Sequence, residues 1–130
     1  MPTRRTIIAL ALLPLAAVVL SGLMPAPDSA MHFRLERSVP AADSVVPPPT
    51  EVRLWFSQGA QEDATTIRII DAGGDPLESG ALSSTDDRME HALPLPGTLP
   101  DGRYTVAWRS MAADGHVVRG DFQFTVRAQE

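Results

Sequence analysis

The sequence contains no cysteine and no lysine. The absence of cysteine excludes disulfide scaffolds, thiolate zinc sites and attachment of a lipid to an N-terminal cysteine. All 11 basic residues are arginines, against 16 acidic residues, so the formal net charge is −5. A negative chain argues against a nucleic-acid partner, because binding to nucleic acid needs a basic surface that neutralises phosphates.

Long apolar runs are scarce as well. The main one covers residues 7–20, is interrupted by Pro14 and follows Arg4 and Arg5. A basic start, a short apolar run and small residues before position 31 predict a secretory signal over residues 1–30. The paired arginines leave a signal of the twin-arginine type open, and an uncleaved membrane anchor is a further alternative.

The remaining segment, residues 31–130, shows no helical periodicity and is interrupted by many turn residues. The whole chain has 12 prolines and 9 glycines. Apolar and polar residues alternate with period two in four windows, at residues 52–56, 67–69, 104–108 and 122–126. Successive side chains of a strand point to opposite faces, so this alternation predicts half-buried antiparallel strands. We expect one all-β domain, a two-sheet Greek-key or immunoglobulin-like sandwich of about seven strands.

Histidine is rare, and one of the three histidines closes the sequence Asp114-Gly115-His116. Two residues apart, Asp114 and His116 can face the same way and offer a carboxylate oxygen and an imidazole nitrogen. This pair suits a borderline divalent metal such as Cu(II), Ni(II) or Zn(II). The alternative interpretation is a plain hairpin turn at Asp114-Gly115 followed by a surface histidine.

The other two histidines differ in their expected surroundings. His32 lies at the predicted start of the mature chain, where a free amine with a pKa of roughly 8 could bind Cu(II) together with the imidazole. Cleavage that leaves Met31 in place would remove this chelate, and a disordered terminal histidine without a role is the alternative. His91 shares strand parity with Met89 and Leu93, so we expect it to face the core or to pack at the edge of the sandwich, and whether it contributes to a metal site stays open.

Methionine-rich tracts and enzyme motifs are missing. The few methionines are scattered, so we expect no Cu(I) site, which would need several thioether ligands. The sequence has no nucleophile elbow, zinc-protease motif, phosphate loop or cysteine nucleophile, and these absences predict a protein that is not an enzyme.

Several segments together resemble the CopC (copper-resistance protein C) family. Residues 32–41 resemble its H-x-x-L-x-x-S-x-P-A opening, and residues 51–57 contain a match to V-x-L-x-F-S. The most specific stretch is residues 102–109, which are similar to G-x-Y-x-V-x-W-R and precede the D-G-H sequence at the family's spacing. Residues 118–126 then resemble the closing V-x-G-x-F-x-F-x-V.

The resemblance implies a small periplasmic β-sandwich that binds copper and carries or buffers it for copper tolerance or delivery. By the family pattern, one Cu(II) ion per chain is held by His32, through its amine and imidazole, and by Asp114 and His116. The implied partners are the copper ion and an inner-membrane copper importer or other periplasmic copper carriers. The methionine-rich loop of Cu(I)-binding members is absent between Ser57 and Leu82.

Two other function classes remain open from the sequence. One is a metal-free structural or protein-interaction sandwich that has kept the fold and lost the copper site. The other is copper oxidase or monooxygenase chemistry, because an N-terminal histidine brace also occurs in oxidative enzymes.

Overall fold

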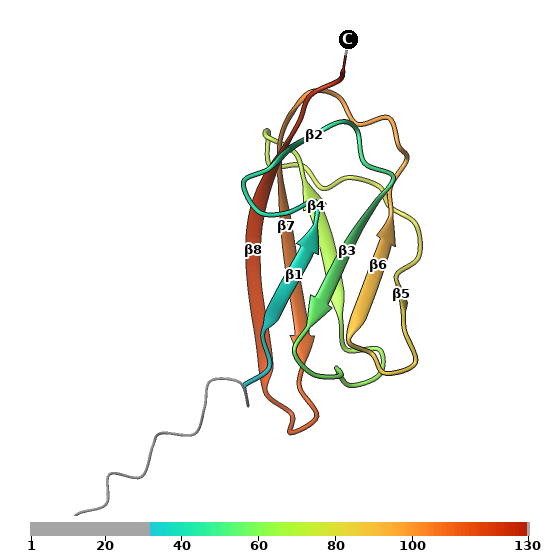
Figure 1. The fold of residues 1–130 in the computed structure, drawn as a ribbon, viewed down its shortest axis with the longest axis vertical. Helices are drawn as coiled ribbons and strands as arrows, with labels where there is room; N and C mark the ends of the chain where they lie inside the picture. The colour runs from blue at the N-terminus through green and yellow to red at the C-terminus, as the bar shows by residue number, and fades with distance from the viewer. Residues whose placement is uncertain (1–31, 130) are drawn as a thin grey trace, which may run out of the picture.

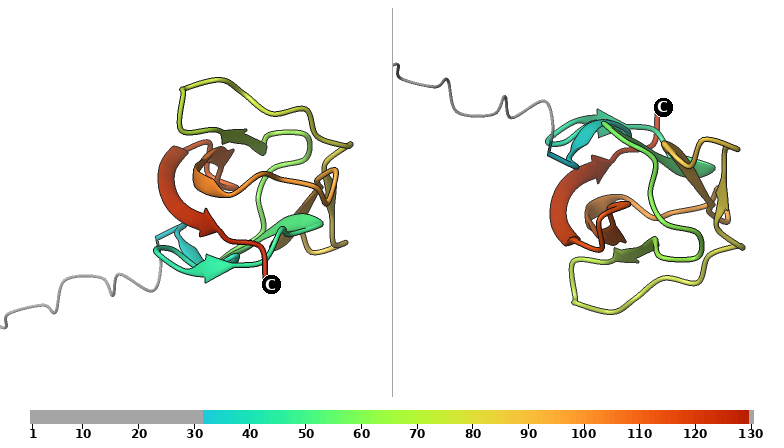
Figure 2. Two further views of the ribbon diagram at one scale, coloured as in Figure 1. Left: turned by 90° about the horizontal axis from the view of Figure 1, so that it is seen from above. Right: turned by 90° about the horizontal axis from the view of Figure 1, so that it is seen from below.

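The computed structural model describes residues 32–129, which form two four-stranded sheets packed face to face (Figures 1 and 2). The predicted signal, residues 1–30, and Met31 lie outside the described residues. Residues 32–129 contain no helix, and so none with the length and hydrophobicity of a membrane span.

Eight strands make up the two sheets. They are β1 (Leu35–Val39), β2 (Val45–Val46), β3 (Glu51–Phe56), β4 (Thr66–Ile70), β5 (Ser83–Ser84), β6 (Glu90–Pro94), β7 (Gly102–Met111) and β8 (Val117–Val126). One sheet has the order β1-β3-β6-β5 and the other β2-β8-β7-β4. All strand pairs are antiparallel except β2 with β8. The prediction of a two-sheet all-β sandwich is confirmed. The structure has eight strands where about seven were expected, and two of the eight, β2 and β5, have only two residues each.

The core lies between the sheets and consists of the residues that alternate toward the inside. Strand β3 shows this most clearly, because Val52, Leu54 and Phe56 are at most 1% exposed while their neighbours are half-buried. Strand β7 buries Tyr104, Val106 and Trp108 in the same way, and alternate residues of β4, β6 and β8 complete the core. They include Ile67, Ile69, Leu93, Phe124 and Val126.

An aromatic cluster fills one end of the core. The ring of Phe56 stacks on Phe33 at a centroid distance of 4.8 Å and meets Trp108 edge-on at 5.2 Å. The imidazole of His91 contacts the same ring edge-on at 5.4 Å. Because Phe33 precedes β1, this cluster fixes the path of the chain just before the first strand.

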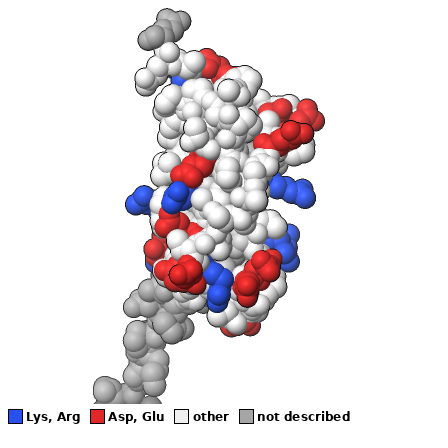
Figure 3. Space-filling view, turned by 90° about the vertical axis from the view of Figure 1, so that its right-hand side faces the viewer, with Lys and Arg blue, Asp and Glu red and all other residues white. Residues whose placement is uncertain are grey.

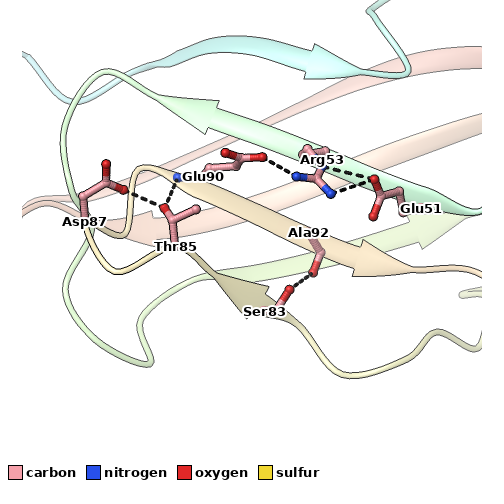
Figure 4. Close-up of polar contacts among 7 residues, drawn as sticks. All are labelled: Glu51, Arg53, Ser83, Thr85, Asp87, Glu90 and Ala92. Atoms are coloured by element: carbon pink, nitrogen blue, oxygen red, sulfur yellow. Dashed lines mark hydrogen bonds and ion pairs between the residues drawn. The ribbon is translucent and has the colours of Figure 1, made fainter.

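Polar contacts cover the outer face of the sheet that contains β3 and β6 (Figure 4). Arg53 donates hydrogen bonds to Glu51 at 2.9 and 3.1 Å and also to Glu90, and these contacts, Glu90 first, raise the pKa of Arg53. The guanidinium of Arg37 lies 4.0 Å from the ring centroid of Trp55. On the side seen in Figure 3, acidic and basic side chains are interspersed around an uncharged centre.

Gly120 sits directly opposite Trp108 in the β7–β8 pair. A Cβ atom at this position would lie 2.8 Å from Cζ2 of the indole, which is too close for any real contact. We expect Gly120→Ala to lower the free energy of unfolding by about 1–3 kcal/mol, the usual range for overpacking. Urea unfolding measures the change. Gly73→Ala is the control, because its nearest atom would be 3.4 Å away, and equal losses in both variants would contradict the prediction.

Candidate metal centre

The turn between β7 and β8 carries the Asp114-Gly115-His116 sequence. It is closed by two backbone hydrogen bonds, from Ala112 N to His116 O at 2.8 Å and from Gly115 N to Ala112 O at 2.9 Å. Gly115 has φ of 90°, a left-handed conformation that glycine adopts without a steric penalty. The turn therefore needs glycine between the two candidate ligands, and it holds their backbones in one arrangement.

Asp114 and His116 lie side by side on this turn. The backbone N–H of His116 donates to Asp114 Oδ1 at 2.9 Å, and Asp114 Oδ2 is 3.5 Å from His116 Nδ1. The amide hydrogen bond from His116 is the largest cause of the lowered pKa of Asp114. The side chains are 69% and 81% exposed, respectively. The prediction that they face the same way is confirmed, and the pair offers solvent an ionised carboxylate beside an imidazole.

His32 is held through its backbone by Ser57, the residue that follows β3. The Ser57 hydroxyl donates to the carbonyl of His32 at 3.0 Å and accepts from the N–H of Arg34 at 3.0 Å. The N–H of Ser57 donates in turn to the carbonyl of Arg34 at 2.9 Å. Phe33 is buried on Phe56 between these bonds. The exposed His32 therefore precedes β1 closely, and β1 starts at the same end of the sandwich as the β7–β8 turn (Figure 1).

The three sequence-predicted ligands are not gathered into one cluster. Within the part of the chain that the structure describes, no group of three or more His, Cys, Asp or Glu side chains is placed to hold a metal. Asp114 and His116 are together, whereas His32 shares their end of the molecule without joining them. All three side chains are exposed, so they can turn toward a bound ion without disturbing the core.

Gln61, in the loop after β3, supports the turn from the side. Its N–H donates to the carbonyl of Met111 at 2.9 Å, and its side-chain amide donates to the carbonyls of Ala112 at 3.1 Å and Ala113 at 3.4 Å. Sequence reasoning missed this role and that of Ser57. Ser57 was visible only as the end of a strand motif, and no local pattern marks Gln61, because its partners are about fifty residues away in the sequence.

His91 faces the core, as its strand parity predicted. It is 3% exposed, and Nε2 lies 3.0 Å from the carbonyl oxygen of Arg88. Nδ1 is buried without a hydrogen-bond partner. Burial is the main cause that lowers the pKa of His91. The imidazole lines a polar pocket of about 450 Å³ that also contains Asp63 and Asp86, and it belongs to no metal-binding group among residues 32–129.

Comparison with known proteins identifies the family. The family model described as the CopC domain matches residues 35–127. The chain belongs to the CopC family. It is 32% identical over 121 residues to copper resistance protein C of Escherichia coli, covering 85% of this chain and 95% of that protein.

Two solved structures resemble the fold described above. The crystal structure of CopC from Methylosinus trichosporium OB3b has a TM-score of 0.68 and 35% identity, covering 76% of this chain and 97% of that one. PcoC, a methionine-rich copper resistance protein from Escherichia coli, has a TM-score of 0.66 and 28% identity, covering 74% and 99%.

The buried imidazole of His91 makes the stability of this CopC-family chain depend on pH. Burial lowers the pKa of His91 below the ordinary value of 6.5, so the unfolded chain takes up this proton at a higher pH than the folded chain. The contribution of His91 to the free energy of unfolding is therefore full above about pH 6.5 and decreases as the pH falls below that value. Urea unfolding between about pH 7.5 and pH 5 measures the dependence.

Two variants isolate the contribution of His91. His91→Gln keeps a donor for the Arg88 carbonyl but does not titrate, so its midpoint should change less with pH than that of the unaltered protein. His116→Ala removes an exposed histidine and should leave the dependence intact. The same pH dependence in the unaltered protein and in His91→Gln would show that His91 is not its source.

Ser57 makes the hydrogen bonds that hold the segment before β1. We expect Ser57→Ala to cost about 1–2 kcal/mol, because the N–H of Arg34 and the carbonyl of His32 lose a partner. The amide of Arg34 should then exchange its hydrogen faster, which NMR-detected hydrogen exchange measures. Ser57→Thr keeps the hydroxyl and is the control. Unchanged exchange at Arg34 in Ser57→Ala would mean that the Ser57 hydroxyl does not hold the segment.

Proposed function

We propose that this chain binds one Cu(II) ion through His32, Asp114 and His116, and carries or buffers copper in the periplasm for tolerance or delivery. The observation that supports it most directly is the Asp114–His116 pair, in which a carboxylate and an imidazole lie 3.5 Å apart on an exposed turn. The names of relatives in the same family, copper resistance protein C and PcoC, agree with a role in copper handling.

The donor atoms explain the choice of metal. Imidazole nitrogen and carboxylate oxygen suit Cu(II), and Cu(II) binds such sites more tightly than the other divalent first-row metals. The lowered pKa of Asp114 keeps its carboxylate ionised well below neutral pH, as a ligand must be. Cu(I) would require soft thioether ligands, and the methionines Met89 and Met111 of the described residues are half-buried and scattered, so we propose no Cu(I) site.

His32 contributes most if the mature chain begins with it. Its amine and imidazole would then close a chelate on the same ion, and the clamp from Ser57 supports this arrangement by holding the His32 backbone. Residues 1–30 would act as the signal that exports the chain. We propose binding rather than catalysis, with an inner-membrane copper importer or other periplasmic copper carriers as the proteins that exchange copper with this one.

The first test is native mass spectrometry of the protein exported by its own signal, with one equivalent of Cu(II) added. We expect a mass that begins at His32 and retains one copper ion. A mass that begins at Met31 or earlier, with no copper retained, would contradict the proposal and favour the metal-free interaction domain.

A variant locates the site in the same experiment. His116→Ala removes the imidazole of the turn and should weaken Cu(II) binding by at least about 100-fold, more than the loss of a residue that only supports a ligand. Competition with a chromophoric chelator measures the affinity. His91→Gln is the matched control, because it removes a histidine that is buried in the core and belongs to no metal-binding group among residues 32–129. Equal affinities of His116→Ala and the unaltered protein would exclude His116 as a ligand.

A further inference from the structure

Three arginines gather on the outer face of the β2-β8-β7-β4 sheet, close to the β7–β8 turn. Arg109 in β7 lies directly opposite Arg119 in β8 and, on its other side, opposite Thr66 in β4. Arg68 is two residues further along β4, and alternate residues of a strand share a face. Arg68, Arg109 and Arg119 are all exposed, so one surface carries all three guanidinium groups. We call it the arginine face.

None of these three side chains has a hydrogen bond or an ion pair within residues 32–129. Other arginines of the fold do have partners: Arg53 pairs with Glu51 and Glu90, and Arg37 stacks on Trp55. Like charges directly opposite each other on neighbouring strands are destabilising. The opposed Arg109 and Arg119 therefore lower the stability of the β7–β8 pair, although the chain has more acidic than basic residues.

The arginine face is hollowed and reaches the candidate metal centre. A shallow groove of about 300 Å³ runs between the arginines, and its lining also contains Ala107, Gly120 and one carboxylate, that of Asp121. Met111 and Val117, which are paired across β7 and β8, lie between the groove and the turn, and Val117 is 37% exposed. His116 comes next, three residues and therefore about 10 Å along the chain from Arg119.

We propose that the arginine face is the docking surface for a protein partner that presents a cluster of carboxylates, and that docking there brings the partner's copper ligands to the β7–β8 turn. The transfer of copper to this partner rests on the proposed function, whereas the docking itself does not. Guanidinium groups bind carboxylates through two parallel hydrogen bonds and keep their charge when water is removed. An interface that combines arginine with apolar contacts such as Met111 and Val117 matches the composition of protein interfaces.

The chemistry favours an acidic protein over an anionic membrane. Basic segments that bind acidic lipids usually gather four to eight lysines and arginines, whereas this face has three and also carries Asp121. The net charge of −5 repels an extended anionic surface. A localised carboxylate cluster can instead meet the arginines at short range, where the rest of the surface matters less.

The test measures binding of a fluorescein-labelled decaglutamate peptide to the copper-free protein at low ionic strength, by fluorescence anisotropy. We expect Arg109→Gln/Arg119→Gln to weaken binding by about fivefold, as the loss of two exposed charge pairs implies. The matched control is Arg103→Gln/Arg127→Gln, which changes the net charge equally at two exposed arginines near the other end of the same sheet, six residues from Arg109 and eight from Arg119 along the chain. This control should change binding by less than about twofold. Equal losses in both variants, or no loss in either, would overturn the proposal.

Two further measurements separate this surface from the metal site and from lipids. The Cu(II) affinity of Arg109→Gln/Arg119→Gln should equal that of the unaltered protein. Because the peptide is tested without copper, failure of copper binding and failure of docking are seen independently. Phosphatidylglycerol vesicles are the second probe, and stronger binding to vesicles than to the peptide, lost in the same variant, would replace the acidic protein by a membrane surface.

Discussion

The contact of Phe56 with Phe33, Trp108 and His91 holds the functional end of this sandwich together. One ring joins the β1-β3-β6-β5 sheet to β7 of the other sheet and to the segment that precedes β1. Deletion of such a buried aromatic side chain typically costs about 3–5 kcal/mol. Because the segment before β1 is anchored in the core by Phe33, His32 is an ordered residue next to the hydrogen bonds of Ser57 rather than a loose terminus.

An ordered backbone therefore presents the two exposed side chains that we propose as copper ligands. The turn that carries Asp114 and His116 is closed by backbone hydrogen bonds and supported by Gln61, while the two side chains point into solvent. The proposed carrier role would use this combination, since an ordered backbone lowers the entropic cost of binding an ion and exposed side chains leave the ion within reach of an acceptor. The arginine face, formed by this hairpin and the neighbouring β4, would orient that acceptor if the proposed docking holds.

Patterns of neighbouring residues predicted most of the fold. The alternation of Val52, Leu54 and Phe56 predicted a strand with one buried face, and the structure buries all three. Strands β2 and β5 escaped prediction, because two residues are too few to show a period and their pairing depends on β8 and β6. The Asp114–His116 pair was predictable for the same reason as β3, namely that its geometry is set within a few residues by a glycine turn.

Contacts between distant parts of the chain could not be predicted in this way. Ser57 meets His32 across 25 residues, and Gln61 meets Ala112 across 51, so no local pattern marks either partner. The arginine face exists only because the antiparallel register places Arg119 opposite Arg109 and brings Arg68 beside them.

The sequence by itself thus determined the all-β class, the strands β3, β4, β7 and β8 with their buried faces, the Asp114-Gly115-His116 turn and, through its motifs, the family. Only the tertiary structure decided which residues hold His32 at the end that carries this turn, and which charges gather beside it. The physical reason is that local features follow from backbone geometry over two or three residues. Positions across the sandwich instead follow from how two sheets pack around one core.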